Sequence, residues 1–265
     1  MAPAFAILHI PHSSTVVPAH VRGSLCLSEK DLAHEIFSMT DHNTDELFDY
    51  QFEPVHRIVF PVSRLVLDPE RFSDDALEPM AEKGMGVLYM KTSDGRPLRH
   101  PGFIPTKTEL IEEFYLPHHK KLDTIVAESL RDYHSCLILD CHSFPLKPLS
   151  YESHSEKPRP EICLGTDRFH TPEWFAAEAE RLFQMKGFRV ARNYPFCGVL
   201  VPGRFYWKQP TVLALMIEVN RSLYMNEISG ERLPEFLDFK NILLSVVSDL
   251  IVYARKKLSA FIDSF

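Results

Sequence analysis

Short apolar runs alternate with longer amphipathic stretches along this chain, and turn residues separate the two kinds of segment. Short continuous apolar runs predict buried strands, and an apolar period near 3.6 residues predicts helices. Strands that alternate with helices indicate a layered α/β fold. The pattern predicts strands at residues 5–10, 55–60, 64–67, 136–139, 161–164, 188–192 and 212–219, and a loop with a short strand within 84–92. It predicts helical stretches at 28–39, 106–133 and 233–262.

Several helix ends carry their own signals. Ser28 precedes two acidic residues and predicts an N-cap, and Thr44 predicts the cap of a second, short helix. Thr171-Pro172-Glu173 combines a cap residue, a proline for the first turn and an acid near the positive helix end. Pro117 predicts a kink or a break within 106–133, because proline lacks the amide hydrogen.

Two of the predicted strands lead into histidines. His12 follows the first strand, and His142 follows the strand at 136–139. Ligands of open α/β sheets bind at the carboxyl ends of strands, so we expect these histidines to meet although they are far apart in sequence. Asp140 lies two residues before His142 and therefore on the same side of a strand, where a carboxylate orients a liganding histidine. Taken alone, His12 is better explained as a loop histidine that bonds its neighbours.

A zinc site with two histidines needs a third protein ligand and an open position for water. Asp41 is the expected ligand. Asp45 is the runner-up, because His42-Asn43-Thr44-Asp45 has the spacing of two ligands on one helical turn. The alternative interpretation is that both acids lie at a helix start, where acids are favourable.

Glu218 follows the last apolar strand run and has two interpretations. It pairs with Arg221, or it acts as a general base that takes a proton from the attacking water. Arg64, Arg71 and Arg221 lie near strand ends, where bidentate recognition of a carboxylate is the specific alternative to simple exposure. In the His118-His119 pair, His119 is the candidate for a polarising group in the pocket.

Composition narrows the function classes. The 265 residues are 45% hydrophobic and 25% charged, which is enough for a sizeable core, and we expect a single domain over 1–265. The net charge is −7 without a basic run, which excludes nucleic acid as a partner and leaves local arginines to attract an anionic substrate. The five cysteines form no CxxC pair, which disfavours a structural zinc knot or a disulfide framework.

The remaining compositional features concern location. The apolar segment at 243–254 is short and carries Asp249, so no membrane span is expected. Residues 1–5 lack the basic start of a signal peptide. We therefore expect a cytoplasmic protein.

In their order along the chain, these motifs resemble the N-formylglutamate amidohydrolase family. The matching stretches span nearly the whole chain: Pro11-His12-Ser13, Thr40-Asp41-His42, Ser63-Arg64-Leu65-Val66-Leu67-Asp68 with Arg71, Pro117-His118-His119, Asp140-Cys141-His142-Ser143, Leu164-Gly165-Thr166, and Glu218 with Tyr224-Met225. The chain departs from the family pattern in two places. Asp68-Pro69-Glu70-Arg71 stands where the family typically reads Asp-Leu-Asn-Arg, and Cys197-Gly198-Val199 stands where it has Gly-Gly-His.

The resemblance implies a three-layer α/β fold similar to zinc exopeptidases and aspartoacylases, with a mixed central sheet flanked by helices. It implies that His12, Asp41 and His142 hold one divalent metal, most simply Zn²⁺. It also implies that Glu218 promotes attack by water. The other expected site residues are His119 as polarising group, Arg64, Arg71, Arg221 and Ser143 at the substrate, and Asp68 and Asp140 beside the metal ligands.

The sequence thus predicts a zinc-dependent amidohydrolase that cleaves a small N-acyl acidic amino acid, the N-formyl derivatives included. One alternative is a relative that binds a metal or small molecule without turnover. A metal-free serine hydrolase that uses Ser13 or Ser143 is the other, and the lack of a GxSxG elbow disfavours it.

Overall fold

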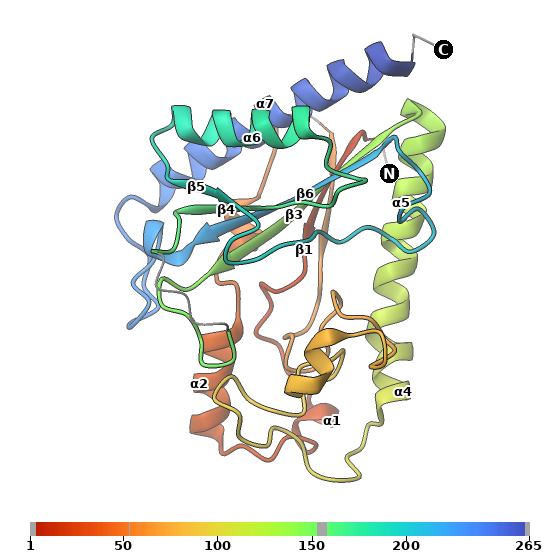
Figure 1. Cartoon of the computed structure of the whole chain (residues 1–265). Helices are drawn as coiled ribbons and strands as arrows, with labels where there is room; N and C mark the ends of the chain where they lie inside the picture. Colours follow the sequence, from red (N-terminus) through yellow and green to blue (C-terminus); the bar gives the residue numbers. More distant parts are fainter. Residues whose placement is uncertain (1–3, 53, 153–157, 263–265) are drawn as a thin grey trace.

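Six strands form one mixed sheet at the centre of the protein (Figure 1). The computed structural model describes residues 4–52, 54–152 and 158–262, so the start of the segment read for a signal peptide lies outside it. Neighbouring strands are parallel except for β4 and β6. The strands are β1 (Ala6–Ile10), β2 (Val55–Val59), β3 (Cys136–Phe144), β4 (Ile162–Gly165), β5 (Val190–Arg192) and β6 (Val212–Asn220), in the order β2-β1-β3-β6-β4-β5.

Helices cover both faces of this sheet. In Figure 1, α6 and α7 lie along one face, and the long α5 lies at the other side. No helix in the described ranges has the length and apolar character that a membrane crossing requires. The helices are α1 (Ala19–Arg22), α2 (Glu29–Met39), α3 (Thr44–Leu47), η1 (Pro79–Lys83), α4 (Lys107–Leu110), the π-helical turn η2 (Ile111–Tyr115), α5 (Leu116–Tyr133), α6 (Glu173–Met185), η3 (Arg221–Leu223) and α7 (Phe236–Ile262).

Strand alternation divides the core between the two faces. Successive side chains of a strand point to opposite sides of the sheet. Leu8 and Leu139 therefore pack on the side of α6 and α7, whereas Ile7 and Ile138 pack on the side of α5. The predicted layered α/β fold with a mixed, helix-flanked sheet is confirmed.

The helix signals are confirmed in part. Ser28 caps α2, since its Oγ accepts a hydrogen bond from the Asp31 amide at 3.1 Å. A π-helical turn interrupts the helical stretch just before Pro117, which is the predicted break. The threonine caps are wrong: Thr44 Oγ1 donates to the Asp41 carbonyl at 2.8 Å, and Thr171 Oγ1 donates to the Ala214 carbonyl at 2.6 Å.

Two predicted strands do not form. Residues 64–67 and 84–92 fold into turns, with isolated bridges in the second segment. Residues 64–67 lie beside Arg99, whose Nη2 donates to the carbonyls of Leu65 at 2.9 Å and Val66 at 2.7 Å. These carbonyls would accept hydrogen bonds from a neighbouring strand if the segment were in a sheet, and here the Arg99 guanidinium takes the place of those donors.

Arg99 therefore acts as a buried brace for the loops beside the sheet. Its side chain also donates to the Tyr89 carbonyl at 3.2 Å and to Ser24 Oγ at 2.8 Å, and the residue is 3% exposed. Burial lowers the pKa of Arg99 to about 10, which leaves the guanidinium charged at neutral pH. The brace holds the turn at residues 64–67 in place.

We expect Arg99→Met to lower the free energy of unfolding by about 2–3 kcal/mol, because the change leaves several buried carbonyls without donors. Urea unfolding measures this loss. The control is Arg96→Met, which removes an exposed arginine paired with Asp94 and Asp31 and should cost less than about 1 kcal/mol. Equal losses in the two variants would contradict the bracing role.

Candidate metal centre and active site

The sheet face on the side of α5 changes from apolar to polar along the strands. Its polar positions are His9, Asp140, His142 and Glu218, all buried. His9 stands opposite Asp140, and His142 stands opposite Glu218 in the parallel register. Asp140 and His142 thus lie within β3, which runs on to Phe144 instead of stopping before the histidine as predicted.

Two loops add His12 and Asp41 to this face. His12 lies just beyond β1, and Asp41 lies just beyond α2. The Asp41 amide donates to the His12 carbonyl at 3.0 Å, which joins the two loops. The structure therefore brings Asp41 to the histidines, whereas the runner-up Asp45 is exposed and offers its backbone carbonyl to Arg57.

Asp41 lies near the Nδ1 atoms of both histidines, although the compact group of potential ligands that contains His12 and His142 is completed by Glu70 and not by Asp41. Asp41 Oδ2 lies 3.0 Å from His142 Nδ1 and 3.7 Å from His12 Nδ1. Among the described residues, the buried His12 Nδ1 has no hydrogen-bond partner. Ligands of a tetrahedral zinc ion lie about 3.3 Å apart, given metal–ligand distances near 2.0–2.1 Å. An orphaned imidazole nitrogen at this spacing from a carboxylate fits a metal ion.

The opposite nitrogens of both imidazoles face carboxylates. Asp68 Oδ1 lies 2.9 Å from His12 Nε2, and Asp140 Oδ1 lies 3.3 Å from His142 Nε2. Asp140 is itself held by the Leu200 amide, which donates to its Oδ2 at 3.0 Å. A carboxylate on the far nitrogen of a histidine fixes its tautomer and ring orientation. Of the two Nδ1 atoms, that of His12 is without a hydrogen-bond partner among the described residues, whereas that of His142 is bonded to Asp41.

Glu70 and His9 also belong to the cluster, and neither is among the residues predicted from the sequence. Glu70 Oε1 lies 3.2 Å from His142 Nε2, and its Oε2 lies 3.7 Å from His12 Nε2. Two compact groups of potential metal ligands contain it: His12 with Glu70 and His142, and His9 with Glu70 and Asp140. The one signal in the sequence is its place two residues after Asp68.

Asp68 also contacts two of the arginines that were predicted to bind substrate, Arg64 and Arg71. Arg64 Nη2 donates to Asp68 Oδ2 at 2.8 Å, and Tyr89 donates its hydroxyl to the same oxygen at 2.6 Å. Arg71 lies farther away, with Nε 3.6 Å from that oxygen, and its buried Nε has no hydrogen-bond partner in the described part of the chain. Arg64 is thus hydrogen-bonded to Asp68, whereas Arg71 contacts the same carboxylate only as a longer ion pair.

Arg221 does not pair with Glu218. Its Nη2 lies 3.4 Å from Asp41 Oδ1 and its Nε lies 3.4 Å from Ser143 Oγ. Glu218 Oε2 is buried and makes no hydrogen bond to any described residue. The alternative in which Glu218 serves only as the partner of Arg221 is therefore wrong.

His118 and His119 lie at the start of α5. His118 Nε2 is 2.9 Å from His9 Nε2, and His119 Nε2 donates to the Pro69 carbonyl at 2.8 Å. Burial lowers the pKa of His118 to about 2 and that of His119 to about 4, so both rings are neutral at neutral pH. His119 thereby supports the loop that carries Asp68, and its role as a polarising group stays a prediction.

Burial and neighbouring charges set the protonation of the cluster. Burial alone would raise the pKa of Asp41 and Asp68, but the adjoining histidines, and Arg64 at Asp68, outweigh it and hold both values below the usual range. Burial would lower the pKa of His142, yet Glu70 and Asp140 raise it well above its usual value. At Glu218, burial outweighs the opposing charge of His142 and raises the pKa to about 8.

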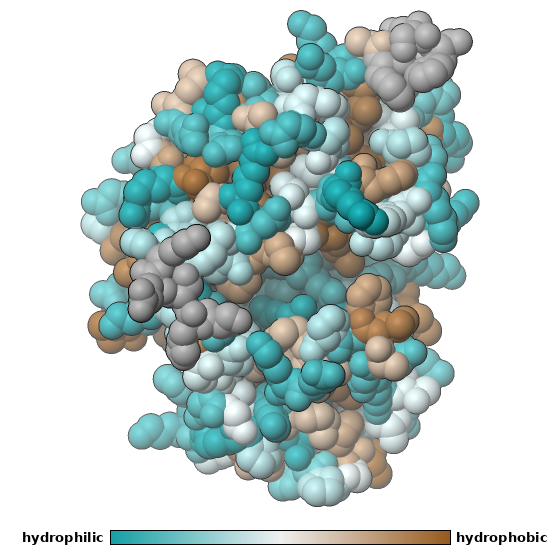
Figure 2. Space-filling view, in the orientation of Figure 1, coloured by the Kyte–Doolittle hydropathy of each residue, from teal (hydrophilic) through white to brown (hydrophobic). Residues whose placement is uncertain are grey.

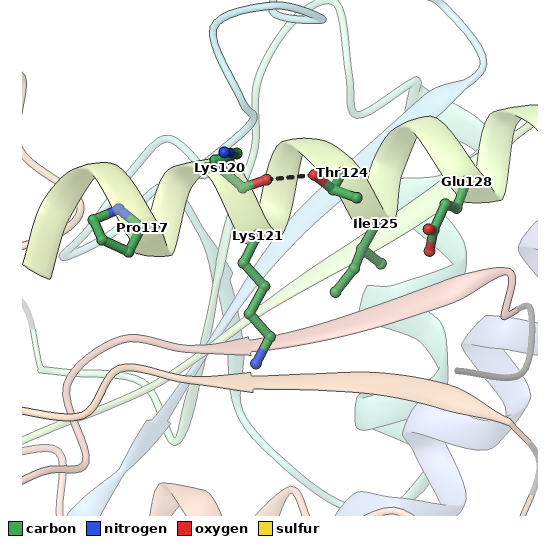
Figure 3. A pocket seen from close by; sticks show the side chains of 6 residues that line it. All are labelled: Pro117, Lys120, Lys121, Thr124, Ile125 and Glu128. Atoms are coloured by element: carbon green, nitrogen blue, oxygen red, sulfur yellow. Dashed lines mark hydrogen bonds between the residues drawn. The ribbon is translucent and has the colours of Figure 1, made fainter.

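The surface has a polar recess and a separate pocket. Figure 2 shows hydrophilic residues in a recess between the sheet layer and the part of the chain that contains α1 and α2. A pocket of about 370 Å³ lies on α5 between Pro117 and Glu128 (Figure 3). Thr124 in this pocket donates its hydroxyl to the Lys120 carbonyl at 2.8 Å. None of the predicted site residues lines it, so its position does not mark the chemistry.

The mixed sheet and the buried histidine–carboxylate cluster define an α/β protein with a candidate metal centre. The chain belongs to the N-formylglutamate amidohydrolase family, whose model matches residues 5–225. Its fold is similar to that of an N-formylglutamate amidohydrolase from Ralstonia eutropha JMP134, with a TM-score of 0.83 and 22% identity over 96% of this chain and 95% of that one. A gene product from Agrobacterium tumefaciens is similar with a TM-score of 0.63 and 17% identity, over 96% of this chain and 92% of that one. No curated protein matches the chain significantly.

The raised pKa of Glu218 predicts a pH dependence of stability for the metal-free protein. The folded state holds a proton on Glu218 that the unfolded state loses above about pH 4.5. The stability that this proton contributes is full below about pH 4.5 and is lost as pH rises towards 8. We expect Glu218→Gln to remove on the order of 3 kcal/mol from the difference in unfolding free energy between pH 5 and pH 8.

Urea unfolding in chelator at both pH values measures this difference. His12 and His142 have pKa values raised by the cluster and also lose stability above about pH 6.5, so only the comparison with wild type isolates Glu218. Glu112→Gln, at an exposed glutamate, should parallel the wild type. An unchanged difference in Glu218→Gln would contradict the assignment of a buried, protonated Glu218.

Proposed function

We propose that this protein is a metal-dependent amidohydrolase that cleaves the amide bond of a small, anionic N-acyl amino acid. The single observation that carries the proposal is the orphaned, buried His12 Nδ1, which lies 3.7 Å from the Asp41 carboxylate that His142 Nδ1 also contacts. Glu218 lies opposite His142 in the sheet, as a general base beside this centre must. Family membership supports the reaction class.

His12, Asp41 and His142 would hold the metal, and Zn²⁺ suits their two imidazoles and one carboxylate. When bound, the ion supplies Lewis acidity that polarises the amide carbonyl and activates water. Asp68 and Asp140 keep the imidazoles oriented from their far nitrogens. Arg221 keeps Asp41 in place through its Nη2.

The protein's own groups account for the proton and the substrate charge. Glu218 accepts the proton of the attacking water and returns it to the leaving nitrogen. Its carboxylate form is favoured once a positive ion lies nearby, because such a charge offsets the effect of burial. Arg71 binds the substrate carboxylate through its planar donor fork. Its guanidinium suits this role because its Nε lies 3.6 Å from Asp68, beyond hydrogen-bonding distance.

The metal assignment predicts which variants lose the ion. Purified protein should hold one divalent ion per chain, and His142→Ala and Asp41→Asn should each lose most of it. Glu70→Gln should retain it at saturating zinc, because Glu70 faces the other edge of the imidazoles. Elemental analysis after dialysis measures the content, with His34→Ala, at an exposed histidine, as control. If Asp41→Asn keeps its metal and Glu70→Gln loses it, the ion is held at the Nε2 edge of the imidazoles instead, and the proposed ligand set is wrong.

Glu218→Gln tests the reaction itself. The amide keeps the shape of the side chain but cannot accept the proton, so kcat for N-formyl amino acids should fall by roughly 10²–10⁴-fold. Zinc content should be unchanged, which separates lost catalysis from a lost site. The measurement is kcat and zinc content on one preparation. A variant that turns over nearly as fast as wild type would refute the general-base role.

A further inference from the structure

Two of the five cysteines lie near the proposed general base. Cys163 on β4 stands directly opposite Glu218 on β6 in their antiparallel register. Side chains that are directly opposite in an antiparallel pair lie on the same face of the sheet, with Cβ atoms about 4.5–5.5 Å apart. The Cys163 side chain is therefore a neighbour of Glu218, whose buried Oε2 makes no hydrogen bond to any described residue.

The segment after β5 brings Cys197 to the same place. The Cys163 thiol donates to the Phe196 carbonyl at 3.3 Å, and Cys197 is the next residue. A carbonyl oxygen lies about 2.8 Å from the following Cα of a trans peptide, so Cys163 Sγ is within about 6 Å of Cys197 Cα. The Gly198 carbonyl packs so closely on Gly165 of β4 that a side chain at position 165 would collide with it. Packing of this segment on β4 thus keeps the two cysteines together.

The two thiols differ in the way that a reversible disulfide requires. Cys197 is exposed, whereas Cys163 is fully buried. Burial raises the pKa of Cys163 to about 12, so the buried thiol stays protonated and the exposed one reacts first. Redox-sensing cysteines are solvent-accessible and often lie next to a second, resolving cysteine. Cys197 also stands at one of the two places where the chain departs from the family pattern.

We propose that Cys197 and Cys163 form a reversible disulfide when the protein meets a peroxide, and that this bond switches off hydrolysis at Glu218. The effect on hydrolysis rests on the proposed function, whereas formation of the disulfide does not depend on it. The pair is thus a modification site beside the catalytic base.

The reaction balances with hydrogen peroxide as the oxidant. The Cys197 thiolate attacks one peroxide oxygen, the O–O bond breaks, and the other oxygen leaves as water, so that Cys197 becomes a sulfenic acid. The Cys163 sulfur then attacks the sulfenic sulfur and displaces its hydroxyl group, which leaves as water with the Cys163 thiol proton. Two thiols and one peroxide thereby give one disulfide and two waters. A dithiol reductant restores both thiols by exchange.

The disulfide would act on catalysis because of where it forms. It replaces the present hydrogen bond of the Cys163 thiol and draws Cys197 from solvent to the strand position opposite Glu218. It also constrains the segment that leads to Leu200, whose amide holds Asp140 at 3.0 Å. Both changes restrict the base and the approach of water to it.

Peroxide treatment of the zinc-loaded protein tests the inference. A few molar equivalents of hydrogen peroxide should remove two hydrogen atoms from each chain, as measured by intact mass, and peptide mapping should join Cys163 to Cys197. We expect kcat for N-formyl amino acids to fall at least about tenfold, which is part of the roughly 10²–10⁴-fold that a general base contributes. Dithiothreitol should restore the activity.

Substitutions of single cysteines separate this pair from general oxidation. Cys197→Ser should form no cross-link and should keep its activity under the same treatment. The matched control is Cys26→Ser, which removes a thiol bonded to the Pro97 carbonyl and should respond as wild type does. A wild type that gains oxygen atoms without a cross-link, or that joins other cysteines, would overturn the disulfide. Full activity in the cross-linked protein, or equal inactivation of Cys197→Ser, would overturn the switch.

The mass and the peptide map also separate this inference from the proposed function, because neither needs turnover. If the reduced protein hydrolyses no N-formyl amino acid, the proposed amidohydrolase activity fails. A cross-link between Cys163 and Cys197 would still support the modification site in that case, and its absence would refute it.

Discussion

The buried carboxylate of Asp68 is the interaction on which the site depends. One oxygen faces His12 Nε2 at 2.9 Å, and the other accepts from Arg64 at 2.8 Å and from the Tyr89 hydroxyl at 2.6 Å. Its side chain has no exposed surface, so each partner must be in place for the charge to be tolerated. The Asp68 carboxylate thus links the ring orientation of His12, a candidate metal ligand, to the position of the loop that carries Arg64.

Asp68 has this position because of two weaker supports. Arg99 bonds the carbonyls of Leu65 and Val66 just before it, and His119 donates to the Pro69 carbonyl just after it. Both donors come from outside the loop, one from a neighbouring loop and one from α5. The turn at 64–67 is therefore held by polar contacts from distant segments, and its apolar sequence alone predicted a strand.

This distinction explains how much of the molecule was predictable from the sequence. Strands of the central sheet are read from continuous apolar runs, and the placement of Asp140 and His142 on one side follows from strand alternation. The meeting of His12 with Asp41 was expected. The hydrogen bond from the Asp41 amide to the His12 carbonyl, which holds the two loops together, cannot be predicted from composition or spacing. Local pattern is thus informative wherever neighbours within one strand decide the geometry.

Glu70 and His9 escaped prediction for the opposite reason. Nothing local distinguishes Glu70 from a surface glutamate in a turn, and its relation to His12 and His142 arises only when the loop after β2 folds over β1 and β3. His9 lies inside an apolar strand, where a histidine is usually explained by packing. Its partner Asp140 stands opposite it on β3, a register that depends on the whole sheet.

The cluster would couple the binding of a cation to folding. Asp41, Asp68, Asp140, Glu70 and Glu218 crowd one region, and a buried carboxylate is costly unless positive charge compensates it. Arg64 and Arg221 supply part of that charge at Asp68 and Asp41. In the metal-free protein, the raised pKa values of His12 and His142 favour their positively charged forms, and the raised pKa of Glu218 favours its neutral form. A divalent ion would displace protons from the histidines, so its affinity and the stability of this sheet edge are linked through the same residues.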